Sequence, residues 1–283
     1  MRRTLDLSRF TTGPKEQRQQ FVDELLSSFG ETGFVKLISH GFEQQKLNDL
    51  FTEKWGLFSH SKTFFDQSLE AKNEIPNVTG SKPVMRWYTG LSTEYTSKLH
   101  TDEKIRVMTD TKRPASASRP GVWWSAAFQI TNLRLTHYPP IPIEEMRSGR
   151  TSHIAPHSDF GILTLLFQGS TGGLEVGNRS GPGTFVTVPP TDTKEMIANV
   201  GDTLQRWTNG KLFGGLHRVT IPEPMKKADG VVLPKRFTMA YLFKTQRTVS
   251  VGPLPKFITA DNPAKYPDIN ALEFQQRRNI LYT

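Results

Sequence analysis

The chain has 283 residues, a formal net charge of +9 and no cysteine. The lack of thiols excludes disulfides, thiolate zinc sites, iron–sulfur clusters and cysteine nucleophiles, so His, Asp and Glu remain as metal ligands. The lysines and arginines are scattered, with only short clusters such as Lys226-Lys227 and Arg277-Arg278, and this pattern does not favour a nucleic-acid partner.

The start of the sequence carries no visible targeting signal. Met1-Arg2-Arg3 is followed by polar residues rather than by an apolar stretch and a cleavage site, and no run approaches 18 apolar residues. We therefore predict a cytoplasmic protein without a membrane segment, folded as a single domain over residues 1–283. The sequence leaves its oligomeric state open.

Two helices and a strand are predicted in the N-terminal region, residues 1–124, which we expect to pack on the core. Residues 14–29 have Pro14 in the first turn and apolar side chains four residues apart, and Gly30 stands where a helix would end. Residues 33–38 read as a strand. Residues 45–58 are apolar at steps of three and four, which predicts a second amphipathic helix.

The sequence between residues 130 and 250 changes to short apolar or alternating runs, separated by Gly, Pro, Asn and Asp. Runs at residues 162–167, 185–188, 196–200 and 237–243 are typical of an antiparallel sandwich or barrel. We predict that this segment is the catalytic core. Residues 251–283 form a C-terminal extension, with a short helix predicted at residues 263–278. Residues 199–202 read as a turn between strands.

Two histidines and an aspartate within the β region indicate a metal site. In an extended strand His157 and Asp159 emerge on one face, about 7 Å apart at the backbone, while Ser158 faces the other way. His217 lies in a later predicted strand and reaches this pair if the sheet folds over, as it does in a sandwich. Two imidazoles and one carboxylate suit a redox iron with open coordination positions. A zinc helix at His153 and His157 is disfavoured by Pro156.

A later strand offers a carboxylate-binding pair. Arg236 and Thr238 share one face of a strand that is otherwise apolar, so a guanidinium and a hydroxyl can meet one carboxylate. A surface arginine is the alternative, but a charge within an apolar strand must find a partner.

A series of short motifs occurs along the core in the order found in a known family. These motifs are Tyr138-Pro139-Pro140, His157-Ser158-Asp159, the run at residues 160–168, Gly172-Gly173-Leu174-Glu175-Val176, Asn199-Val200-Gly201-Asp202, Trp207-Thr208-Asn209-Gly210, His217-Arg218-Val219 and Arg236-Phe237-Thr238. Gly33-Phe34 to His40-Gly41-Phe42 and the segment at residues 86–90 match as well. In these motifs, and over most of its length, the sequence resembles the iron(II)/2-oxoglutarate-dependent dioxygenases of the isopenicillin N synthase-like superfamily.

The resemblance implies a mainly β fold with flanking α-helices, built on a double-stranded β-helix (jelly roll) core. It implies an oxidoreductase that uses Fe(II), 2-oxoglutarate and O2, and that oxidises a small organic metabolite by hydroxylation, desaturation, ring closure or ring expansion, in secondary metabolism. By the same resemblance, catalysis and metal binding fall to His157, Asp159 and His217, and cosubstrate binding to Arg236, Thr238 and Tyr138.

The substrate pocket is less well defined by the sequence. Arg86 could meet an acidic or phenolic substrate, because it lies among Met85, Trp87 and Tyr88. The candidate wall residues are Arg86, Tyr88, Phe160, Leu204 (in an expected strand before Trp207) and Phe243.

Three departures from the family stand out. Thr238 keeps a hydroxyl where relatives often have Ser, whereas Thr136 stands where they often have Asn. The loop between His217 and Arg236 is longer than usual. The connection from Trp124 to Tyr138 is short, so either a helix that backs the sheet has been lost or residues have been left out there.

Two other functions fit parts of the pattern. An iron oxidase of the same fold would not use 2-oxoglutarate, and its Arg236 would hold a substrate carboxylate. A non-enzymatic jelly-roll binding module is the third hypothesis, and the three intact metal ligands argue against it.

Overall fold

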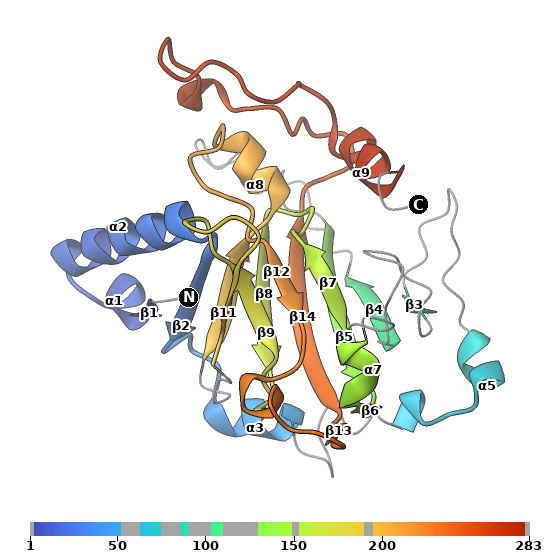
Figure 1. The fold of residues 1–283 in the computed structure, drawn as a ribbon. Coiled ribbons are helices and arrows are strands. Elements are labelled where there is room, and N and C mark those ends of the chain that lie inside the picture. The colour runs from blue at the N-terminus through green and yellow to red at the C-terminus, as the bar shows by residue number, and fades with distance from the viewer. Residues whose placement is uncertain are drawn as a thin grey trace.

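Two facing β-sheets with helices on the outside make up the computed structural model (Figure 1). The structure describes residues 3–51, 63–74, 86–89, 103–109, 130–148, 153–189 and 195–280. Within these ranges no helix is both long and apolar enough to cross a membrane. The predicted mainly β fold with a jelly-roll core and flanking helices is confirmed.

The described residues form a major sheet, a minor sheet and a two-stranded ribbon. In spatial order the major sheet contains β1 (Thr4–Asp6), β2 (Phe34–Ile38), β11 (Met196–Val200), β8 (Leu163–Gln168), β14 (Arg236–Lys244), β5 (Ile130–Tyr138), β4 (Glu103–Thr109) and β3 (Arg86–Thr89). The minor sheet contains β10 (Phe185–Thr187), β9 (Leu174–Gly177), β12 (His217–Val219) and β7 (Ile154–His157). The ribbon joins β6 (Ile141–Pro142) and β13 (Val232–Leu233).

The helices lie around these sheets. They are α1 (Ser8–Thr11), α2 (Lys15–Glu31), α3 (Gln44–Phe51), α5 (Leu69–Asn73), α7 (Ile143–Arg147), α8 (Asp202–Trp207) and α9 (Ala271–Ile280), with 3-10 turns at Glu223–Met225 and Pro255–Phe257. Figure 1 shows α8 and α9 at one end of the sheets and α3 at the other.

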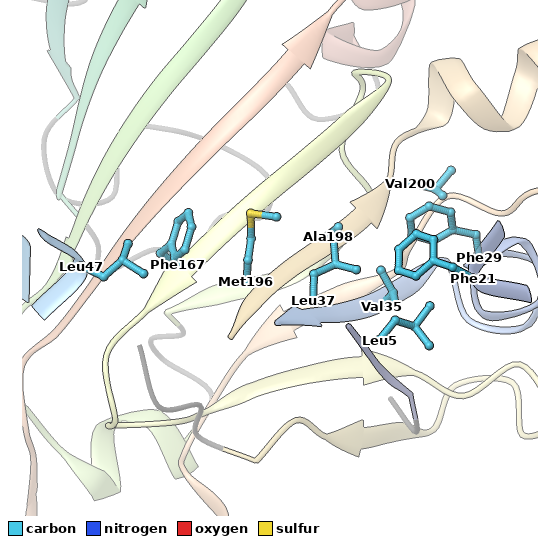
Figure 2. Close-up of a cluster of buried hydrophobic side chains, with 10 residues drawn as sticks. All are labelled: Leu5, Phe21, Phe29, Val35, Leu37, Leu47, Phe167, Met196, Ala198 and Val200. Carbon is cyan, nitrogen blue, oxygen red and sulfur yellow. The ribbon is translucent and has the colours of Figure 1, made fainter. Parts of the chain in front are cut away.

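Strand alternation gives the major sheet two different faces. Val35 and Leu37 of β2 and Met196 and Ala198 of β11 point outward, into a hydrophobic cluster that also takes in apolar side chains of α2 and α3 (Figure 2). The intervening residues, such as Phe34, point inward toward the minor sheet and join a second cluster there. The inner face is therefore the one available to build a site.

The predicted N-terminal elements are present, with shifted ends. The first helix runs to Glu31, two residues beyond the predicted end, so Gly30 lies inside it. The glycine required after this helix is Gly33, whose φ is +77° and whose added Cβ would lie 2.5 Å from the carbonyl oxygen of Phe213. The second predicted helix is seen as α3, and residues 52–58 of that prediction lie outside the described residues.

The C-terminal prediction also needs a correction. The helix begins at Ala271 rather than at residue 263, and the preceding residues form an extended connection that includes an isolated β-bridge between Ser250 and Asn270. Residues 130–138 of the short connection before Tyr138 belong to β5, and its earlier part lies outside the described residues. The single-domain organisation stays a prediction.

Candidate metal and cosubstrate site

The three predicted metal ligands come together between the sheets. His157 ends β7, His217 begins β12, and the two are direct partners in the antiparallel pairing of these strands. Their rings lie 4.2 Å apart between centroids. Asp159 follows two residues after β7, in a loop rather than in the predicted strand. One ligand atom from each of the three side chains lies within 4.8 Å of the other two, a spacing that can hold a metal ion.

Backbone carbonyl groups orient both imidazoles. Nδ1 of His157 lies 2.9 Å from the carbonyl oxygen of Ala155, and Nδ1 of His217 lies 2.8 Å from that of Gly215. Because a carbonyl oxygen only accepts, each Nδ1 carries the proton and donates it. This leaves each Nε2 with a lone pair for a metal, which is the usual arrangement of metal-binding histidines.

The carboxylate of Asp159 is held by two neighbours. Its Oδ2 accepts hydrogen bonds from Thr164 Oγ1 at 2.7 Å and from Asn199 Nδ2 at 2.8 Å. Burial raises the pKa of Asp159, but the two imidazoles and these two hydrogen bonds outweigh it and lower the pKa to about 2. Asp159 is therefore a carboxylate at neutral pH, as a metal ligand must be.

The role of Asn199 was not anticipated. The sequence predicted a turn at residues 199–202, but Asn199 lies within β11 and is only 3% exposed, while Asp202 starts α8. The prediction was wrong because Asn, Gly and Asp are typical turn residues, whereas here the Asn side chain serves a buried carboxylate. The available signal was alternation in β11, which places Asn199 on the inner face together with Ile197.

A cavity between the sheets contains this trio and extends beyond it. It has a volume of about 600 Å³ including its open mouth. Along β5 and β14 its lining residues alternate, as inward-facing positions should. The side chains from these two strands are Arg134, Thr136, Tyr138, Arg236, Thr238, Ala240 and Leu242.

Arg236 lies at one end of these strands, and one of its nitrogens is available for a ligand. It is 2% exposed, its Nε donates to the carbonyl oxygen of Gly172 at 3.0 Å, and its Nη2 donates to Gln168 Oε1 at 2.7 Å. The guanidinium lies 4.8 Å from the ring centre of Tyr138. Nη1 is buried without a hydrogen-bond partner, and no described carboxylate pairs with Arg236.

This environment fits a dicarboxylate such as 2-oxoglutarate. A buried cation without a counter-charge is unfavourable until an anion joins it. Arg236 and Tyr138 are direct partners across β14 and β5, and so are Thr238 and Thr136, which places the predicted cosubstrate residues side by side. Thr238 is 4% exposed and lines the same cavity.

His153 is a neutral group beside this cation. Its ring packs against Tyr138, with 5.0 Å between centroids, and it is 3% exposed. Burial, and then the charge of Arg236, lower the pKa of His153 from 6.5 to about 3. A second positive charge is thereby kept away from Arg236 at neutral pH.

The lowered pKa of His153 predicts a loss of stability in mild acid. Below pH 6.5 the unfolded chain binds a proton that folded His153 does not take up until about pH 3, so the free energy of unfolding falls as pH drops through that window. Between pH 7 and pH 5 the natural protein should lose about 2 kcal/mol more than a His153→Asn variant. Denaturant unfolding of both proteins at pH 7 and pH 5 measures this difference. An equal loss of unfolding free energy in the natural protein and in the variant would contradict the prediction.

The predicted pocket residues have mixed outcomes. Leu204 lies in α8 rather than in a strand and packs against the outer hydrophobic cluster, so the prediction that it lines the pocket was wrong. Phe243 does not line the cavity, because its neighbour Leu242 takes the inward position of β14. Phe160 lies beside Arg278, whose guanidinium is 5.2 Å from its ring centre, and is not among the lining residues.

Two of the predicted pocket residues lie in the N-terminal region, and one residue that lines the cavity was not predicted. Arg86 and Tyr88 lie in β3, opposite Val107 and Ile105 of β4, and their side chains lie outside the described parts of the structure. Arg134 was not predicted, although it lines the cavity. Its spacing from Thr136 and Tyr138 was the signal, since residues two apart in a strand share a face.

Comparison with known proteins indicates the same class of enzyme as the geometry of the site does. The family model described as the 2OG-Fe(II) oxygenase superfamily matches residues 129–245, and the N-terminal model of a non-haem dioxygenase in morphine synthesis matches residues 3–126. The chain is 33% identical to the 2-oxoglutarate-dependent dioxygenase ecdK of Aspergillus rugulosus over 99% of both chains. That alignment spans 336 positions, more than the 283 residues of this chain, so ecdK has residues with no counterpart here. The chain is also 33% identical to the 2-oxoglutarate-dependent dioxygenase imqE of Aspergillus flavus, over 99% of this chain and 94% of that protein.

A solved structure shares the fold. A full-length Neurospora crassa protein, crystallised in complex with alpha-KG and 5-formyluracil, superposes with a TM-score of 0.79 at 22% identity, covering 97% of this chain and 94% of that one. The chain belongs to the 2OG-Fe(II) oxygenase superfamily. It is an Fe(II)- and 2-oxoglutarate-dependent oxidoreductase, as the sequence predicted, and not a binding module.

Proposed function

We propose that the enzyme binds iron through His157, Asp159 and His217 and uses it to oxidise a small organic metabolite in specialised metabolism. The observation that carries this proposal is the presence, in one cavity, of the three ligand side chains and a buried guanidinium nitrogen without a hydrogen-bond partner. Three protein ligands on one side of an iron leave positions for 2-oxoglutarate and O2.

In this proposal the residues at the Arg236 end hold 2-oxoglutarate. Nη1 of Arg236 and the hydroxyl of Thr238 bind its distal carboxylate, which supplies the missing counter-charge. Tyr138 packs on the guanidinium and limits its orientation. Nε and Nη2 stay bound to Gly172 and Gln168, so the position of Arg236 is fixed before the cosubstrate arrives.

With iron bound, O2 would be the oxidant: one oxygen atom would enter succinate as 2-oxoglutarate loses carbon dioxide, and the other would take two electrons from the substrate. The protein contributes position and exclusion of water. Thr164 and Asn199 hold Asp159, and the two backbone carbonyl groups fix the imidazoles. Apolar lining residues such as Leu166 and Leu242 exclude water from the rest of the cavity.

The substrate occupies the part of the cavity away from Arg236. Arg134 lies opposite Ala240, four residues along β14 from Arg236, which is about 13 Å in a strand. A small molecule with an apolar body and a carboxylate, phenol or carbonyl group toward Arg134 fits this end. Two small molecules named for similar proteins support the proposal: morphine in one family description and 5-formyluracil in the Neurospora crassa complex.

The experiment is an aerobic assay followed by a metabolite comparison. The purified protein should release succinate from 2-oxoglutarate only when Fe(II) is present, and chelation should stop the release. Producing cells with the active enzyme should contain an oxidised metabolite that is missing from cells with the Asp159→Asn variant. Identical metabolite profiles, together with no iron-dependent succinate, would defeat the proposal. The cytoplasmic location stays a prediction, which fractionation of these cells tests.

A further inference from the structure

The two arginines at the end of the chain have different environments. Arg277 is exposed and pairs with Glu273 of the same helix, α9, one turn earlier. The side chain of Arg278 is 25% exposed and points inward, away from that pair. Arg278 reaches three residues beside the metal site, and the sequence alone gave no reason to separate it from its neighbour.

The three residues that Arg278 contacts are all direct neighbours of Asp159, in the chain or through a hydrogen bond. Its Nη2 lies 3.1 Å from Asp202 Oδ2 and 3.4 Å from Ser158 Oγ. Its guanidinium carbon lies 5.2 Å from the ring centre of Phe160. Ser158 and Phe160 are the neighbours of Asp159 in the chain, so one side chain contacts the metal-ligand loop on both sides of the ligand.

Asp202, the ion-pair partner of Arg278, is itself hydrogen-bonded to the loop that contains Asp159. Its backbone N–H donates to the carbonyl oxygen of Asp159 at 2.7 Å. The next residue, Thr203, donates its N–H to Gly161 at 3.0 Å and its hydroxyl to Phe160 at 2.8 Å. The start of α8 is therefore hydrogen-bonded along the loop.

The approach of α8 to this loop leaves no spare room. A Cβ added to Gly201 would lie 2.2 Å from the carbonyl oxygen of Gly161 and 3.0 Å from that of Asp159. Asp202 is 8% exposed, and a carboxylate so buried needs a counter-charge to stay in place. Arg278 is the cation that forms an ion pair with it.

The C-terminal segment is bound to α8 by several hydrogen bonds, so its position relative to α8 is fixed. Arg206 of α8 donates to the carbonyl oxygens of Val251 at 2.8 Å and Pro267 at 2.7 Å, and Trp207 Nε1 donates to that of Ser250 at 2.9 Å. The guanidinium of Arg206 also lies 4.8 Å from the ring centre of Phe274 in α9. Figure 1 shows α9 beside α8 at the same end of the molecule.

We propose that Arg278 is a positioning residue for the iron site, through which α9 holds the loop of Asp159 against α8. Its guanidinium balances the charge of Asp202 and contacts Ser158 and Phe160, so the carboxylate of Asp159 is presented to the metal in a fixed place. The inference rests on the proposed ligand role of Asp159.

The test compares Fe(II) binding by neighbouring arginine variants under anaerobic conditions. Arg278→Gln should weaken Fe(II) binding about tenfold, at the lower end of the effect of residues that support metal ligands. Arg277→Gln, which removes the same charge from the same helix, should stay within about twofold of the natural protein. Arg278→Lys keeps the positive charge but loses the planar guanidinium group, so its Fe(II) affinity should lie between those of the two Gln variants.

A double-mutant cycle separates positioning from a general loss of stability. Asp202→Asn should weaken Fe(II) binding by itself, and adding Arg278→Gln to it should cause little further loss. The inference would be overturned if Arg278→Gln reduced Fe(II) affinity equally in the natural protein and in Asp202→Asn. It would also be overturned if Arg278→Gln left the Fe(II) affinity unchanged. If the natural protein itself failed to bind Fe(II), the proposed function would fail instead.

Discussion

Replacing Asp159 with Asn is expected to lower the affinity for Fe(II) by more than about 100-fold, because loss of a ligand exceeds the 10–100-fold cost of losing an outer partner. The amide oxygen of the new side chain can still accept from Thr164 and Asn199, so the metal-free fold should persist. The substitution removes the negative charge and replaces a carboxylate by an amide, which is a weaker metal ligand, while the side chain keeps its shape. Anaerobic Fe(II) titration with thermal melting of the metal-free protein measures both effects.

His153→Asn is the matched control for this experiment. It introduces the same amide six residues earlier, in place of a buried imidazole that packs on Tyr138 rather than joining the ligand cluster. Its Fe(II) affinity should equal that of the natural protein. If the Asp159→Asn variant bound Fe(II) as well as this control does, the assignment of the metal site would be wrong.

Replacing Arg236 with Gln is expected to weaken 2-oxoglutarate binding on the order of 100-fold and to leave Fe(II) binding unchanged. The magnitude is typical of removing one partner of a buried, hydrogen-bonded charge pair. Loss of the hydrogen bonds to Gly172 and Gln168 is offset by removal of a buried charge without a counter-ion, so stability before the cosubstrate binds should change little. Addition of 2-oxoglutarate at 100 times its Kd should stabilise the iron-loaded natural protein by about 2.7 kcal/mol and the variant far less.

Arg134→Gln provides the comparison for the Arg236 variant. It removes a guanidinium from the same cavity, at the position opposite Ala240. Its affinity for 2-oxoglutarate should change by no more than a few-fold. Equal weakening by both variants would mean that general positive charge, and not a specific clamp, attracts the cosubstrate.

The sequence was sufficient to predict the groups with strong chemical constraints. His157, Asp159 and His217 were predicted from ligand type and strand context, and the structure brings them within 4.8 Å of one another. Arg236 and Thr238 followed from an arginine placed in an apolar strand, and both are buried in the cavity. Their placement was predictable because a buried charge and a metal ligand each have few acceptable environments, and their roles in binding stay a proposal.

Residues that act through a neighbour were harder to predict. Asn199 looked like a turn residue, and Leu204 looked like a strand residue, because local composition does not reveal that a strand continues or that a short helix follows. Arg278 appeared as half of a surface cluster, and its contacts come from segments 76 and 120 residues away in the chain. Such long-range contacts have no local signature.

The central claim is that this cavity binds iron and 2-oxoglutarate together. The most direct measurement is the visible absorption spectrum of the anaerobic, Fe(II)-loaded protein during titration with 2-oxoglutarate. We expect a charge-transfer band that saturates at one 2-oxoglutarate per chain and that shifts to much higher concentrations in Arg236→Gln. A protein that binds Fe(II) but develops no such band at any concentration would contradict the account.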